Sequence, residues 1–141
     1  MYTFRQSGNT FVVSISNRQD LVRSLTSFVR EQHITAGSIS GIGAVSEATL
    51  RFYNPTTKEY EDRTFREQME IANLIGNIST LVGEPYLHLH ITLGRADFTS
   101  LAGHLLTAQI NGACEIVIEQ YDDNFARIKD EETGLNLYDF R

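Results

Sequence analysis

The chain has 141 residues, the length of one domain of ordinary size. Its hydrophobic fraction of 41% and charged fraction of 21% are those of a globular protein, which excludes a disordered or low-complexity chain. The net charge is −6 and the basic residues are scattered, so the charge balance disfavours binding to the phosphates of duplex DNA.

The first ten residues are polar and contain no basic segment followed by an apolar stretch, so we expect no signal peptide. No apolar run approaches the roughly 18 residues that a membrane span needs. The sequence therefore predicts a cytoplasmic protein without membrane contact. The single cysteine, Cys114, lies in an aliphatic run and is expected to be a core residue, not a catalytic thiol.

An amphipathic helix is predicted from about Arg18 to His33. Asn17 is the expected N-cap, and Asp20 lies in the first turn, where the helix dipole favours an acidic side chain. His33 is expected to cap the C-terminal end. The core-facing stripe shows helical spacing and consists of Leu21, Leu25, Phe28 and Val29.

Three glycines follow, at positions 37, 41 and 43, and Gly37 is a plausible end for the helix. A phosphate-binding loop would need a helix after the glycines, but residues 47–53 alternate between apolar and polar as a strand does. The glycines therefore predict a bend or bulge between strands that needs free backbone torsion.

The other strands are short and are separated by turn signals; they are predicted at residues 11–15, 47–53, 60–64, 69–75, 77–82, 86–93, 104–110 and 113–121, with a last strand within 125–141. Residues 97–103 are expected to form a loop or one helical turn. Asn111-Gly112 is a strong signal for a two-residue hairpin turn.

One early helix followed by strands with short connections predicts an α+β fold. We expect a largely antiparallel β-sheet or half-barrel with one long N-terminal helix packed on it, as a single domain over residues 1–141.

Residues 86–93 alternate cleanly and place His88 and His90 on one face of a strand, roughly 6–7 Å apart at their roots. His104 begins the next predicted strand, and an antiparallel neighbour would bring it opposite the pair. Three neutral imidazoles with one open position are the ligands of a catalytic zinc site, in which a bound water has a pKa of about 7. Nickel, copper, cobalt or iron also suit imidazole. The alternative is that these histidines are simply solvated.

Glu70 is the carboxylate predicted to act as acid or base beside the metal. It lies in an apolar stretch, residues 69–75, where an unpaired charge would be costly to bury. The alternative is that Glu70 sits on the exposed face of its strand.

These motifs resemble the PPC (plants and prokaryotes conserved) domain in order and spacing. The most specific parts are the His-x-His strand at residues 87–91 and the Ala-Gly-His-Leu that follows at 102–105; the others are residues 41–45, 70–71, 76–78 and 133–135. The resemblance implies an antiparallel sheet with helices packed on it, a homotrimer, and a zinc ion on His88, His90 and His104. It also implies a fold similar to acetolactate decarboxylase and to a zinc-dependent ester hydrolase.

Three functions are compatible with this resemblance. The first is a metal-dependent enzyme that acts on an unknown small molecule. The second is a non-enzymatic homotrimeric module that binds DNA or a regulatory partner. In the third, a bound metal is structural and holds the fold or the trimer together. In plants the PPC domain follows an AT-hook that contacts DNA; this chain has no hook.

Overall fold

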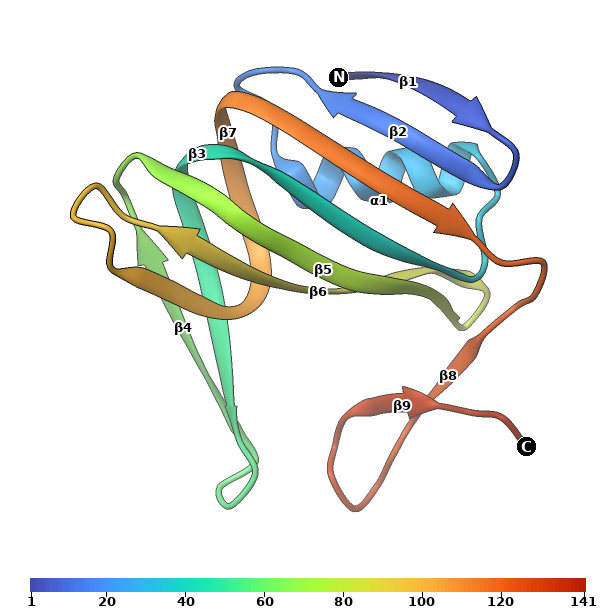
Figure 1. Ribbon diagram of the computed structural model, residues 1–141. Coiled ribbons are helices and arrows are strands. Elements are labelled where there is room, and N and C mark those ends of the chain that lie inside the picture. The colour runs from blue at the N-terminus through green and yellow to red at the C-terminus, as the bar shows by residue number, and fades with distance from the viewer.

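The computed structural model describes residues 1–141 and contains one nine-stranded sheet and one helix (Figure 1). In chain order the elements are β1 (Tyr2–Ser7), β2 (Thr10–Ile15), α1 (Leu21–Glu31), β3 (Gly37–Asn54), β4 (Glu59–Phe65), β5 (Met69–Leu81), β6 (Glu84–Gly94), β7 (Ser100–Gln120), β8 (Ala126–Lys129) and β9 (Asn136–Tyr138). All strand pairs are antiparallel except β5 with β8, so the predicted antiparallel sheet is confirmed.

Four strands pair in a closed ring. The long strands β3 and β7 pair with each other, and each also pairs with one strand of the β5–β6 hairpin. One face of this ring and α1 enclose a single cluster of 25 buried apolar residues. Cys114 belongs to that cluster, and burial raises the pKa of its thiol to about 12, as expected for a core residue. No helix is long and apolar enough to cross a membrane.

The helix is shorter than predicted: α1 has 11 residues, and its N-cap is Asp20, not Asn17. The Asp20 carboxylate accepts a hydrogen bond from the Arg23 amide at 2.7 Å. The Asn17 side chain instead accepts from the Gly112 amide at 3.1 Å, because residues 17–19 first pair with β7. His33 does close the C-terminal end through its backbone. It adopts a φ of 55°, and its amide donates to the Arg30 carbonyl at 3.2 Å.

The glycine-rich segment is not a break between strands, because β3 runs through it. A bulge does occur between Gly41 and Gly43, as predicted. Neither glycine has a positive φ, so the expected need for free torsion is wrong. They are required because β7 lies close: a Cβ at Gly43 would be 2.4 Å from the Ala113 carbonyl oxygen.

The hairpin predicted at Asn111-Gly112 is also wrong, since β7 continues through both residues. Ile110 pairs with Val45 and Cys114 pairs with Gly43, so both halves of β7 follow β3 in the same direction. A type I′ turn needs a positive φ at both central residues, and only Gly112 has one. The two residues form an irregularity within a long strand.

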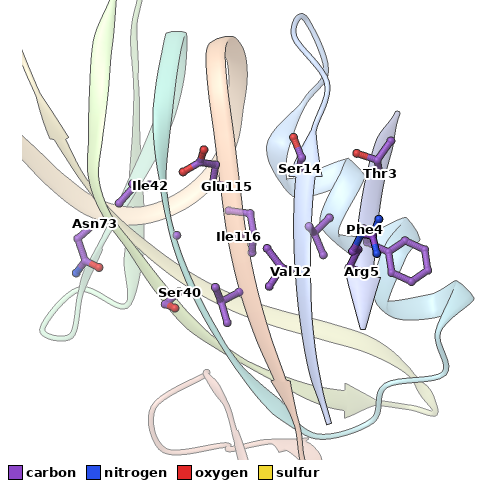
Figure 2. A pocket seen from close by; sticks show the side chains of 13 residues that line it. Thr3, Phe4, Arg5, Val12, Ser14, Ser40, Ile42, Asn73, Glu115 and Ile116 are labelled. Carbon is purple, nitrogen blue, oxygen red and sulfur yellow. The ribbon is translucent and has the colours of Figure 1, made fainter. Parts of the chain in front are cut away.

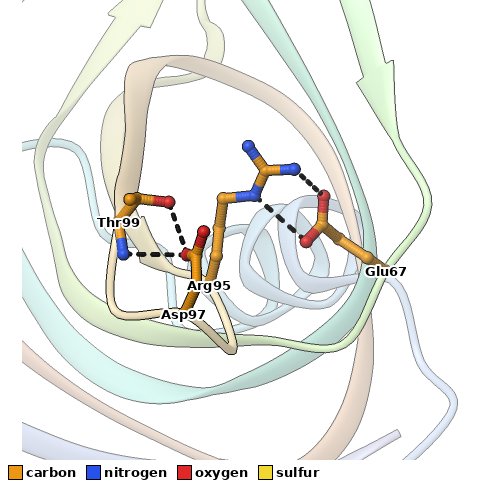
Figure 3. A network of polar contacts seen from close by, with 4 residues as sticks. All are labelled: Glu67, Arg95, Asp97 and Thr99. Carbon is orange, nitrogen blue, oxygen red and sulfur yellow. Dashed lines mark hydrogen bonds and ion pairs between the residues drawn. The ribbon is translucent and has the colours of Figure 1, made fainter.

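The turn between β6 and β7 is held by side chains at both ends (Figure 3). Arg95 donates two hydrogen bonds to the Glu67 carboxylate, at 2.8 and 3.1 Å, and Asp97 accepts from the Thr99 amide and hydroxyl at 3.0 and 2.6 Å. The turn ends at Thr99, so residues 100–103 belong to β7 and not to the predicted loop. This compact turn sets the register between β6 and β7.

Gly76→Ala should destabilise the protein by about 1–3 kcal/mol, because the added methyl group has no room. Its Cβ would lie 2.2 Å from the His88 carbonyl oxygen on β6. Urea denaturation would measure the loss. Gly94→Ala is the matched control on β6, where the nearest atoms are 3.9 Å away and almost no change is expected. Equal stability of both variants would contradict the close contact at Gly76.

Candidate metal centre

His88 and His90 lie on the outward face of β6, because Leu89 and Ile91 on the other face are buried in the core. The antiparallel register places His104 of β7 directly opposite His90. The three ring centroids are 5.1, 5.2 and 5.5 Å apart, and one ligand nitrogen of each ring lies within 4.8 Å of the others. The expectation that His104 joins the pair is therefore confirmed in geometry.

The surroundings keep two of these imidazoles neutral. Partial burial lowers the pKa of His104 to about 4, and the nearby His88, His90 and Arg51 act in the same direction. Partial burial also lowers the pKa of His88, with further contributions from His90 and Arg127. A neutral imidazole has a free lone pair, which a metal ligand requires. The donor set, its spacing and its protonation all fit a divalent metal ion.

The histidines form the floor of a pocket of about 540 Å³. One wall is the arm made by the far end of β3 and by β4, which supplies Tyr53 and Tyr60; the other is the C-terminal segment with β8 and β9, which supplies Arg127 and Leu135. Figure 1 shows both arms projecting from the same side of the ring. They touch where the Tyr53 hydroxyl donates a hydrogen bond to the Thr133 carbonyl.

Arg51 lies beside the three histidines and forms an ion pair with Asp62. It is the register partner of His104 on β3, and its guanidinium donates two hydrogen bonds to Asp62, at 2.7 and 2.8 Å. It also lies 4.6 Å from the centroid of the Tyr60 ring. The ion pair of Arg51 with Asp62 places a cation near the histidines without adding net charge.

The structure does not bring Glu70 to the histidines. It lies exposed near the start of β5, opposite Gly94, and does not line the pocket. The exposed-face alternative for this side chain is therefore the one observed. An acid–base role for Glu70 stays a prediction.

Arg127 is the pocket residue that sequence reasoning missed. It is 9% exposed and lies between Ala126 and Ile128 in a polar C-terminal stretch. An arginine in such a stretch gives no sign of burial, because the residues that bury it belong to β5, β6 and β9.

Fold and site together define a small antiparallel β-barrel domain with an outward-facing three-histidine cluster. The sequence model of the Plants and Prokaryotes Conserved (PCC) domain matches residues 2–122. The chain belongs to this family, the one abbreviated PPC above, as its motifs predicted.

Solved structures agree with this assignment. A Bacteroides thetaiotaomicron protein described as a "putative dna binding protein" is 54% identical, with a TM-score of 0.98 over 99% of this chain and 98% of its own. A metal-containing protein from Archaeoglobus fulgidus is 35% identical, with a TM-score of 0.87 over 98% and 97%. Acetolactate decarboxylase from Bacillus subtilis shares the fold alone, at 14% identity and a TM-score of 0.56 over 89% of this chain and 56% of its own. No curated protein matches the sequence.

The stability of the metal-free protein should fall as the pH is lowered from about 6.5 towards 4. Unfolded histidine has a pKa of about 6.5, whereas folded His104 has a pKa of about 4. Between these values the unfolded state binds more protons, so the free energy of unfolding decreases with decreasing pH.

Urea denaturation of chelator-treated protein across this pH range would measure the effect. His104→Gln should flatten the dependence, whereas His33→Asn, at an exposed position on the end of α1, should leave it as in the wild type. A slope unchanged by His104→Gln would show that this imidazole is not the source.

Proposed function

We propose that the chain binds one divalent metal ion, zinc first among the candidates, through His88, His90 and His104, and acts with it on a small molecule. The observation that carries this proposal is the convergence of three imidazoles whose ligand nitrogens lie within 4.8 Å at the floor of a pocket. If these histidines were simply solvated, we would not expect three of their rings to lie together at one point.

Several features support an ion at this point. Imidazole nitrogens suit zinc, and also copper, nickel and iron. Three protein ligands leave a position free for a substrate, which is the arrangement of catalytic and not of structural zinc sites. The 35% identical relative from Archaeoglobus fulgidus is described as metal-containing.

When bound, an ion of this kind would supply Lewis-acid chemistry at an oxygen of the substrate. The chain's own residues would do the rest: the histidines hold the ion, and the tyrosines and arginines of the two arms orient the ligand and limit its contact with water. Glu70 lies outside the pocket. It could act as acid or base only on a substrate that extends beyond the pocket, or on one bound to another copy of the chain.

Tag-free wild-type protein should contain about one zinc per chain by elemental analysis. The double variant His88→Ala/His90→Ala should lose it, because one remaining imidazole cannot hold the ion. Glu70→Gln is the control on β5 and should retain the metal, because Glu70 lies outside the cluster. Wild-type protein that stays metal-free after zinc is supplied would end the metal hypothesis.

The second candidate function is a homotrimeric module that binds a regulatory partner or DNA, and an exposed apolar strip favours the assembly part of it. The strip crosses the outer face of the sheet (Figure 2). Its largest members are Val12, Ile42, Ile75 and Val117, which are 41–57% exposed. A groove of about 940 Å³ runs along it, lined by β1, β2, β3, β5 and β7. We propose that copies of the chain meet on this strip.

The strip leads to the metal centre. Successive register partners across the sheet are Val12, Val117, Ser40, Ile75, His90 and His104. A neighbouring copy seated on the strip would therefore approach the histidines. This arrangement favours the metal-dependent function over DNA binding, which the net charge of −6 also disfavours.

Val117→Glu should reduce a trimer to monomers, because a charge at the centre of an apolar contact would be buried without a partner. Size-exclusion chromatography with light scattering would measure the mass. Val82→Glu is the control, since Val82 is 95% exposed in the turn between β5 and β6. A monomeric wild type, or a Val117→Glu variant that stays trimeric, would exclude assembly through the strip.

A further inference from the structure

Arg127 is a buried cation without a counter-ion. Its guanidinium donates to three neutral acceptors: the Ser79 hydroxyl at 2.7 Å, the Asn77 side-chain oxygen at 2.8 Å and the Asn136 carbonyl at 2.8 Å. It lies 4.1 Å from the ring centroid of Tyr138 and 5.1 Å from that of Tyr86. No aspartate or glutamate forms an ion pair with it.

This environment fixes the guanidinium but does not neutralise it. Burying an unpaired charge is costly, and stacking on two aromatic rings offsets only part of that cost. A guanidinium has five N–H donors, and the three hydrogen bonds to protein groups leave two of them free. The side chain is thus rigid, charged and able to donate further hydrogen bonds.

The uncompensated positive charge of Arg127 lies in the histidine pocket. Asn77 and Ser79 of β5 pair with His88 and Tyr86 of β6, so the groups that hold Arg127 share the face of the sheet that carries the histidines. The residues lining the pocket include two arginines and no aspartate or glutamate. Because Asp62 neutralises Arg51, Arg127 leaves the pocket with one uncompensated positive charge in a protein of net charge −6.

We propose that this pocket binds a small organic carboxylate and that Arg127 is the residue that recognises it. The inference rests on the proposed function in that it assigns a substrate class to the same site. A carboxylate has the single negative charge that the pocket lacks, and its two oxygens match the planar donors of a guanidinium. A pocket of about 540 Å³ is of the size that encloses a small ligand.

The decisive variant is Asn77→Asp. It keeps the shape of the side chain and the acceptor that lies 2.8 Å from Arg127, but it supplies the missing counter-charge within the protein. The matched control is Asn17→Asp, the same change at an exposed asparagine whose side-chain oxygen also accepts a hydrogen bond, from the Gly112 amide at 3.1 Å, and which lines neither the histidine pocket nor the groove of Figure 2. Circular dichroism would show that both variants are folded.

Ligand-observed NMR titrations would compare acetate, lactate and pyruvate with their neutral amides, in metal-free and in zinc-loaded protein. At least one carboxylate should bind the metal-free wild type about tenfold more tightly than its amide, which is typical of a charged hydrogen bond. Asn77→Asp should remove that preference, and Asn17→Asp should keep it.

Three results would overturn the inference: amides that bind as well as the acids, an Asn77→Asp variant that keeps the preference, or no carboxylate binding by the wild type at millimolar concentration. A fourth result, inorganic phosphate that binds more tightly than every carboxylate, would overturn it in favour of a phosphate ligand. Because the titration is made without metal, failure of zinc binding and failure of carboxylate recognition give separate results.

Discussion

The register between β6 and β7 is the constraint on which the site depends. It closes the ring of strands and sets His104 opposite His90, so one set of backbone hydrogen bonds serves both the fold and the donor cluster. A slip of one residue would turn every side chain on the strand to the other face. The turn between β6 and β7, in which Arg95 donates two hydrogen bonds to Glu67, holds the two strands in this register.

The charges of the site follow from burial, not from the composition of the chain. The protein is acidic overall, yet the pocket contains two imidazoles with lowered pKa values, His88 and His104, a neutralised arginine and a free one. Each arrangement has a local cause: partial desolvation for these two histidines, Asp62 for Arg51, and neutral acceptors with stacked rings for Arg127. An anionic ligand is thus compatible with a chain whose net charge alone would repel it.

The sequence predicted what short-range geometry controls. Alternation along residues 86–93 correctly placed His88 and His90 on one face, because side-chain direction in a strand depends only on position. It failed where distant pairing overrides a local signal: Asn111-Gly112 would turn a free hairpin, but here the two residues form an irregularity, and the segments of β7 before and after it both pair with β3. The burial of Arg127 could not be predicted for the same reason, since two of its hydrogen-bond partners, Asn77 and Ser79, lie about 50 residues away.

The division of the site between ring and arms has an evolutionary consequence. The histidines stand on β6 and β7, whose opposite face packs in the core, but the walls come from the β3–β4 arm and from residues beyond position 122, where the family's sequence model stops. Substitutions in the arms can alter the shape and charge of the opening while the three histidines persist. The walls of the pocket can thus vary among members of the family without any change to the histidine cluster.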